Sequence, residues 1–175
     1  MTPELVLLRK KLEVLGDLVD ELELELVEDP QWAEPSDTSY LNADDRANPD
    51  IMANVEAMAE TNKLIAWFGR DMEGFVGLWR GVDQVALAKA PIVRLDTEGQ
   101  YELVASSIGD YLCIAASNDD FDENRKMVTK AGLAVSGSPD EIWEAIEDYD
   151  SPNDHRHQLY NAQRKQRGLP PISGL

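Results

Sequence analysis

The sequence predicts an α+β protein: N-terminal helices, a central, mainly antiparallel sheet of four or more strands, and C-terminal helices. Three observations support this class. Leucines recur at helical spacing in the first 28 residues, four short β-rich runs separated by turn residues fill the middle, and segments with helix caps follow them. Helices followed by neighbouring strands and then by helices are typical of α+β proteins. The length of 175 residues is that of one domain, which we expect to span residues 1–175.

A leading amphipathic helix is predicted from about residue 3 to residue 28. Apolar side chains three or four residues apart define its buried face: Leu5, Leu8, Leu12, Leu15, Leu18, Val19, Leu22 and Leu26. The last part of this segment reads ELELEL, an alternation that fits a strand instead.

A long surface loop is predicted for residues 28–50, which contain three prolines and many turn-forming residues. We expect Trp32 and Tyr40 to hold this loop against the body of the protein. Asp50 is a suitable N-cap for a helix that runs to about residue 61. The apolar face of that helix would consist of Ile51, Val55 and Met58.

Four strands are predicted in the runs KLIAWFG, GFVGLWRG, APIVRLD and GQYELVAS. Gly69 and Gly74 have the spacing of the glycines in a phosphate-binding loop, but Phe75 and Val76 follow where Lys and then Ser or Thr are required. The insert between the glycines also carries two carboxylates. A hairpin turn is therefore the better interpretation, and DTEGQ, with Gly99, predicts a second tight turn.

Three helices are predicted after the strands. Ser106 or Ser107 would cap the first, and Gly132 would end the second in the left-handed conformation. Ser138 and Glu141 have the spacing of a capping box for the third, with Pro139 at its first position. Its buried stripe would consist of Ile142, Trp143 and Ile146. A last helix is possible from about 154 to 167.

The charge is strongly acidic, with 16 basic and 34 acidic residues and a formal net charge of −18. Such a surface repels nucleic acid unless a basic patch is concentrated somewhere. Two explanations of this acidic charge remain open: it keeps the protein soluble, or it attracts a basic protein. Residues 155–175 contain four basic and no acidic residues, so this basic tail either docks on the acidic body or frays into solvent.

The composition also predicts where the protein works. No run approaches the ~18 apolar residues of a membrane span, and the acidic, helical start does not fit a secretory signal. One cysteine, Cys113, excludes an internal disulfide framework. We expect a soluble cytoplasmic protein with no membrane partner.

No pattern for catalysis or metal binding is complete. Cys113 has apolar neighbours and is expected to be a buried structural thiol. His155 and His157 are two residues apart, which places them on different faces of a helix, and a solvated tail explains them better than a metal site. A calcium loop counted from Asp119 fails at its sixth and twelfth positions. We expect a non-enzymatic protein without cofactor or metal; a hydrolase that uses carboxylates and a divalent ion remains an alternative.

Aromatic residues gather around the first hairpin. Trp67 and Phe68 are consecutive and should lie on opposite faces of a strand, whereas Phe75 and Trp79 should share a face. One of these sets should pack in the core. If the other set is exposed, it would anchor a partner.

The succession LIAWFGRDMEGFVGLW and APIVRLDTEGQYELVASSIGDYL resembles the SUKH superfamily, over about residues 61–117. The matching features are the turn with its flanking glycines, an aromatic-rich second strand that ends in Trp79, a strand led by Pro91, an acidic second turn, and VASS before a helix that bears Tyr111. Known members include bacterial immunity proteins and a fungal regulator of cell-wall synthesis. The resemblance implies a small domain with a curved sheet packed on helices. The leading helix and the tail after Asp150 lie outside it.

The resemblance further implies a protein that neutralises a toxin, often a nuclease, by binding it. The acidic charge fits a partner that is basic where it holds nucleic acid. The alternative function is a cytoplasmic regulatory or scaffold module. The candidate contact residues are Asp71, Met72 and Glu73 in the first hairpin, Asp96 and Glu98 in the second, and Asp119, Asp120, Asp122 and Glu123 before the following helix.

Overall fold

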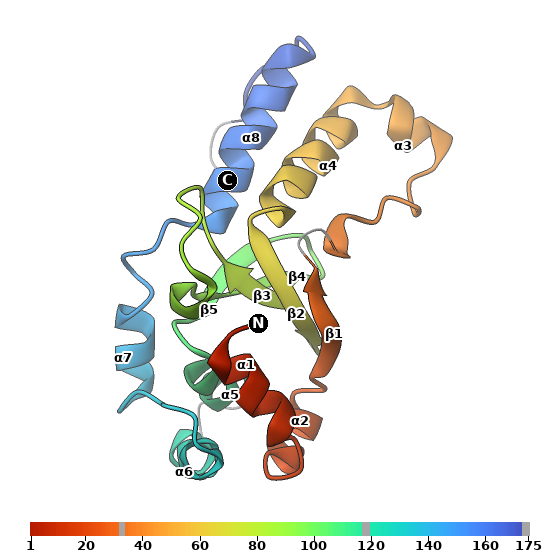
Figure 1. The fold of residues 1–175 in the computed structure, drawn as a ribbon. Coiled ribbons are helices and arrows are strands. Elements are labelled where there is room, and N and C mark those ends of the chain that lie inside the picture. The colour runs from red at the N-terminus through yellow and green to blue at the C-terminus, as the bar shows by residue number, and fades with distance from the viewer. Residues whose placement is uncertain (32–33, 117–119, 173–175) are drawn as a thin grey trace.

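The computed structural model describes residues 1–31, 34–116 and 120–172, and it shows the predicted α+β architecture (Figure 1). In chain order the elements are α1 (Pro3–Lys10), α2 (Gly16–Glu21), β1 (Glu25–Gln31), η1 (Glu34–Ser36), α3 (Ala43–Ala47), α4 (Pro49–Asn62), β2 (Ile65–Asp71), β3 (Gly74–Trp79), η2 (Leu87–Lys89), β4 (Ile92–Asp96), β5 (Tyr101–Ala105), α5 (Ile108–Ala116), α6 (Phe121–Ala131), α7 (Pro139–Glu144) and α8 (Pro152–Gln166).

The sheet has five strands in the order β1-β2-β3-β4-β5, and each strand pairs antiparallel with the next. The four predicted strands are confirmed, and β1 is added at one edge. Gly74 pairs with Asp96 across β3 and β4, so the β2–β3 turn and the β4–β5 turn lie at the same end of the sheet.

Both faces of the sheet are covered. One face carries the larger core, which includes Phe68 and side chains from α1, α2, α5, α6 and α7; the other carries a smaller cluster that includes Trp67 and Trp79. Trp67 and Phe68 thus lie on opposite faces, as predicted, and Phe75 shares the face of Trp79. The described chain buries all of these rings at least partly, so the condition for an anchor, an exposed aromatic set, is not met.

The continuous helix predicted from residue 3 to 28 is wrong. α1 ends at Lys10, α2 is a separate short helix, and the chain reverses at Glu23, which has a φ of +50°, before it enters β1. Leu22 and Leu24 are buried while Glu23 and Glu25 are exposed. The strand begins only at Glu25, after this turn, and pairs with β2, so pairing between strands prevails over helical propensity in the last part of the segment.

The long loop contains more structure than the sequence predicts. α4 is capped by Asn48 rather than by Asp50, because the Asn48 side chain accepts hydrogen bonds from the backbone N–H groups of Asp50 (2.9 Å) and Ile51 (3.4 Å). Tyr40 is 71 % exposed and does not hold the loop down. Trp32 lies outside the described residues.

The helix caps after the sheet agree largely with the sequence. The Ser107 hydroxyl accepts from the Asp110 N–H (3.1 Å), and Gly132 ends α6 with a φ of +97°. At α7 the capping box is incomplete, because the Glu141 carboxylate accepts from the Gly137 N–H (2.7 Å) and not from that of Ser138. Trp143, which was predicted to be buried, is exposed.

The basic tail docks on the body as α8, which packs along α4 (Figure 1). Arg164 forms an ion pair with Asp50, and Arg167 forms one with Glu56 (2.6 Å). Tyr160 packs on Ala53 and donates a hydrogen bond to Asp50 (2.7 Å). The alternative of a frayed tail is therefore wrong for the described part of the chain, up to residue 172.

Candidate functional site

The β2–β3 turn is held by the carboxylate of Asp71. Its Oδ1 atom accepts hydrogen bonds from the backbone N–H groups of Glu73 and Gly74, both at 3.0 Å. An aspartate that bonds to the backbone two or three residues later fixes the turn locally. Gly74 is required as well, because a Cβ atom there would lie 2.0 Å from the carbonyl oxygen of Leu95.

The second oxygen of Asp71 belongs to a buried ionic network. Asp71 Oδ2 accepts from Arg94 Nη2 (2.9 Å), from Arg94 Nε (3.2 Å) and from the Tyr111 hydroxyl (2.8 Å). The Asp71 side chain is 0 % exposed and that of Arg94 10 %, and the other end of the guanidinium donates to Glu73. Removing one partner of such a buried, hydrogen-bonded ion pair strongly lowers stability, because the other charge then stays buried without compensation.

The pKa values in this network follow from burial and from the neighbouring charges. Burial alone would lower the pKa of Arg94, but the carboxylates of Asp71 and Glu73 outweigh burial and raise the pKa above its usual value. Burial first, and then the charge of Asp71, raise the pKa of the Tyr111 hydroxyl. Tyr111 therefore stays protonated and donates to Asp71 at neutral pH.

The three predicted contact residues of the first hairpin consequently differ in exposure, since one is buried and two are exposed. Asp71 is inside the protein, where it cannot touch a partner, because both of its oxygens are used and covered. Met72 is 57 % exposed, and the Glu73 side chain is also largely exposed. The buried carboxylate thus fixes the turn that presents the other two side chains.

A second segment lies next to this turn. The backbone N–H of Met72 donates to the carbonyl of Leu22 (3.1 Å), which places the α2–β1 connection beside the hairpin. Five exposed or largely exposed side chains share this region, and we name them the hairpin surface: Glu21, Glu23, Glu25, Met72 and Glu73. The three glutamates were missed because a continuous helix was predicted there. The alternation ELELEL was the signal that could have found them.

The β4–β5 turn is built by the same local chemistry. Asp96 Oδ1 accepts from the backbone N–H groups of Glu98 (2.9 Å) and Gln100 (2.8 Å). Asp96 is partly exposed and Glu98 is exposed. Because Gly74 pairs with Asp96, this turn adds negative charge to the end of the sheet that carries the hairpin surface.

The third predicted group lies elsewhere. Asp120, Asp122 and Glu123 are exposed at the start of α6, which packs against α5, away from the hairpin (Figure 1). Asp122 lines a hollow whose other residues are Arg125, Lys126, Thr129 and Lys130. Cations thus outnumber acids among the residues that line this hollow, and we leave α6 out of the proposed contact surface. Asp119 lies outside the described residues.

The remaining candidates for chemistry are structural. Cys113 is fully buried, and burial first, then the charge of Asp110, raises the pKa of its thiol to about 12. His155 is not in a solvated tail, because it lies in α8 with its ring 5.9 Å from that of Trp79. Within residues 1–31, 34–116 and 120–172, no three His, Cys, Asp or Glu side chains are grouped closely enough to hold a metal ion.

Two further findings concern the whole chain. None of the helices in its described part combines the length and the apolar character needed to cross a membrane. Comparisons of the chain with protein-family models, with curated proteins and with solved structures found no match.

Proposed function

We propose that this chain is a non-enzymatic, cytoplasmic binding protein that neutralises a basic toxin domain of the nuclease type by covering its active surface. The observation that carries the proposal is the hairpin surface, in which the exposed Met72 and Glu73 lie on a turn that is fixed from inside, and the adjacent α2–β1 segment adds three exposed glutamates. The resemblance to the SUKH superfamily, whose members include immunity proteins, supports the same function.

The composition of the hairpin surface suits a cationic partner. Methionine is a flexible apolar side chain that adapts to an irregular surface. The surrounding carboxylates, together with the net charge of −18, attract a positive groove and accelerate association. Since a groove that holds phosphates must be positive, an acidic protein bound across it would exclude nucleic acid by both charge and volume.

The fixed geometry of the turn lowers the entropic cost of binding. Asp71 holds the backbone of the turn through two N–H groups, and Arg94 holds Asp71. A loop that already has its bound conformation does not need to be ordered by the partner. The buried network therefore contributes to function indirectly, by positioning Met72 and Glu73.

The test is growth rescue together with binding kinetics. Co-expression with a basic toxin-like protein encoded beside its gene should restore growth. The double variant Glu23→Lys, Glu73→Lys should slow association by roughly tenfold or more at low salt, and the effect should shrink as salt screens the charges. The matched control is Asp122→Lys, Glu123→Lys on α6, which should associate at the normal rate. Equal association rates for both double variants would contradict the proposed surface.

A regulatory or scaffold module is the second candidate function, and a separate groove favours it. This groove, of about 370 Å³, lies along α4, and both apolar side chains, which include Ile51, Val55 and Met58, and polar ones, which include Asp45 and Asn54, line it beside the exposed Tyr40. A scaffold needs more than one contact surface. Affinity capture from the native cell distinguishes the two functions, because one basic effector supports immunity and several housekeeping partners support scaffolding.

A further inference from the structure

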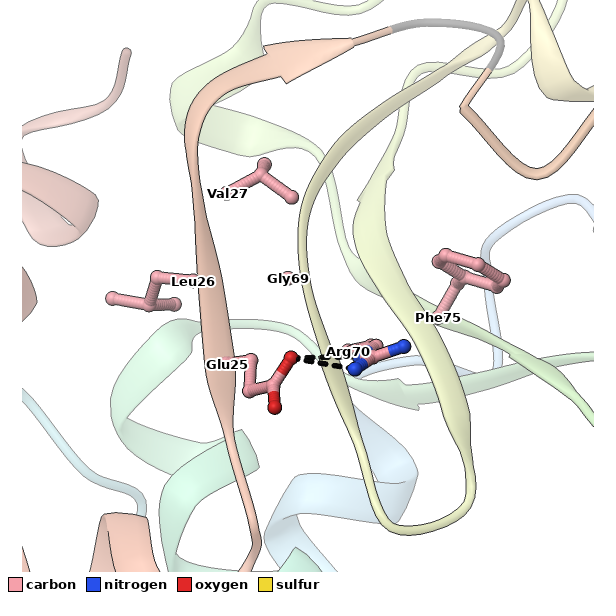
Figure 2. A pocket seen from close by; sticks show the side chains of 6 residues that line it. All are labelled: Glu25, Leu26, Val27, Gly69, Arg70 and Phe75. Carbon is pink, nitrogen blue, oxygen red and sulfur yellow. Dashed lines mark hydrogen bonds and ion pairs between the residues drawn. The ribbon is translucent and has the colours of Figure 1, made fainter.

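A hollow of about 300 Å³ adjoins the hairpin surface, on the face of the sheet that carries Trp67 (Figure 2). Glu25, Leu26 and Val27 of β1, Gly69 and Arg70 of β2, and Phe75 of β3 line it. Ligand pockets begin at about this volume, so the hollow fits one long side chain better than a cofactor. The inference drawn from it rests on the proposed function, because its occupant would belong to the partner.

A β-bulge creates the hollow. Trp67 pairs with Gly77 and Gly69 pairs with Val76, the next residue of β3, so Phe68 is an extra residue of β2 without a partner in β3. Phe68 therefore points into the larger core, and Gly69 lies opposite the core residue Val76 on that same face. The opposite face has no side chain between Trp67 and Arg70, and the backbone of Gly69 forms the floor (Figure 2).

The walls of the hollow are apolar and fixed. Val27 lies on one side and Phe75 on the other, as Figure 2 shows. The ring of Phe75 packs edge-on against the buried ring of Trp67, with 6.1 Å between the centroids. A hollow with two apolar walls and a polar group at one end is suited to a side chain with an aliphatic stem and a charged head.

A carboxylate with one free oxygen lies at the end of the hollow near the hairpin. Arg70 Nε and Nη2 both donate to Glu25 Oε2, each at 2.8 Å (Figure 2). Within the described part of the chain, Glu25 Oε1 receives no hydrogen bond. Both side chains of this pair are more than half exposed, so a partner can reach that oxygen.

We propose that the hollow receives an arginine side chain of the basic partner. The stem lies between Val27 and Phe75, and the guanidinium donates to Glu25 Oε1 and stacks on the Phe75 ring. A lysine would satisfy the charge but would not stack as a plane. Arg70 is offset by Glu25 and Arg94 by Asp71 and Glu73, so the remaining neighbouring charges are those of Glu21 and Glu23, which repel a carboxylate and favour a cation.

The test uses nuclear magnetic resonance on the full, isotope-labelled chain and needs no partner. The probe is the capped tripeptide acetyl-Gly-Arg-Gly-amide, and the comparison peptide carries citrulline, which has the shape of arginine without its charge. We expect saturable shifts of the backbone amides of Gly69, Arg70 and Phe75 with the arginine peptide. The citrulline peptide should bind roughly fivefold more weakly, as should the arginine peptide to the Glu25→Gln variant.

Matched variants separate this site from general charge attraction. Glu60→Gln removes an acid from another exposed ion pair, with Lys63, and should leave the arginine titration unchanged. Val27→Trp fills the hollow without changing the charge and should abolish the saturable shifts, with a folded spectrum as the control.

Failure of this inference differs from failure of the proposed function. Shifts spread over the whole acidic surface, or equal weakening by Glu25→Gln and Glu60→Gln, would overturn the arginine site and leave the proposed function standing. Saturable binding in the hollow, combined with absence of growth rescue by any basic toxin, would support the arginine site and contradict the immunity function.

Discussion

The two turns at one end of the sheet have nearly the same sequence, Asp71-Met-Glu-Gly74 and Asp96-Thr-Glu-Gly99. In both, the first oxygen of the aspartate accepts the backbone N–H of the glutamate two residues later, at 3.0 Å and 2.9 Å. Both reversals thus share an aspartate cap on the glutamate, but they differ in length, because Asp71 pairs with Gly74 whereas Asp96 bonds to Gln100, and in the glycine, whose φ is +156° at Gly74 and +79° at Gly99.

Their surroundings differ. The second oxygen of Asp71 is buried against Arg94 and Tyr111, whereas Asp96 is partly exposed and only backbone N–H groups are seen to donate to it within the described residues. The glycines differ in the same way: a Cβ at Gly74 would overlap the Leu95 backbone, and one at Gly99 would meet only the flexible end of Met58 at 3.5 Å. The comparison teaches that a shared turn sequence fixes the aspartate cap, while the environment fixes how much stability depends on it.

The largest expected effect comes from removing the buried cation. Arg94→Leu leaves the Asp71 carboxylate buried without its partner and should lower the free energy of unfolding by about 3–5 kcal/mol. Urea denaturation measures this. The matched control is Arg70→Leu on the neighbouring strand, whose pair with Glu25 is exposed and should contribute at most about 1 kcal/mol. Equal losses would show that burial does not distinguish these two pairs.

Asparagine in place of each aspartate compares the turns directly. Asn keeps an oxygen that can accept the backbone N–H groups but carries no charge. Asp96→Asn should change the free energy of unfolding by less than about 0.5 kcal/mol, as exposed substitutions usually do. Asp71→Asn should cost about 3 kcal/mol, because the buried Arg94 then loses its buried counter-charge and keeps only the largely exposed Glu73. A loss at Asp96 as large as that at Asp71 would mean that the turn itself carries the stability.

An effect smaller than those of Arg94→Leu and Asp71→Asn concerns the Tyr111 hydroxyl and its pH dependence. Tyr111→Phe removes one hydrogen bond to Asp71 and should cost about 1–2 kcal/mol at pH 7. The folded-state pKa of Tyr111 is raised, mainly by burial, so the folded state keeps its proton where the unfolded chain loses it. Stability should therefore fall as pH rises above about 10.

The alkaline fall should be shallower in Tyr111→Phe than in the parent protein. Part of it should remain, because burial also raises the pKa of Tyr101. Thermal denaturation between pH 8 and pH 11 measures the difference. Parallel curves for the two proteins would contradict a buried, protonated Tyr111.

In the N-terminal region, the local spacing of leucines led to a wrong prediction of one continuous helix. Leucine spacing over residues 3–28 fits a helix, and α1 and α2 do use its first parts. β1 forms because β2 offers an unpaired edge that was not visible in the local pattern, and the turn at Glu23 that leads into β1 leaves both Leu22 and Leu24 in the core. This error also hid three glutamates of the hairpin surface and the hollow beside them.

The sequence by itself determined the class, the four central strands, both turns and the caps at Ser138 and Gly132, and it narrowed the cap of α5 to Ser106 or Ser107, because each depends on residues within a few positions of one another. Only the tertiary structure decided which turn is buried, since Arg94 and Tyr111 reach Asp71 from 23 and 40 residues away. It also brought the α2–β1 connection to the hairpin and docked α8 on α4. Such contacts depend on which surfaces the packed sheet leaves open, and no short stretch of sequence contains that information.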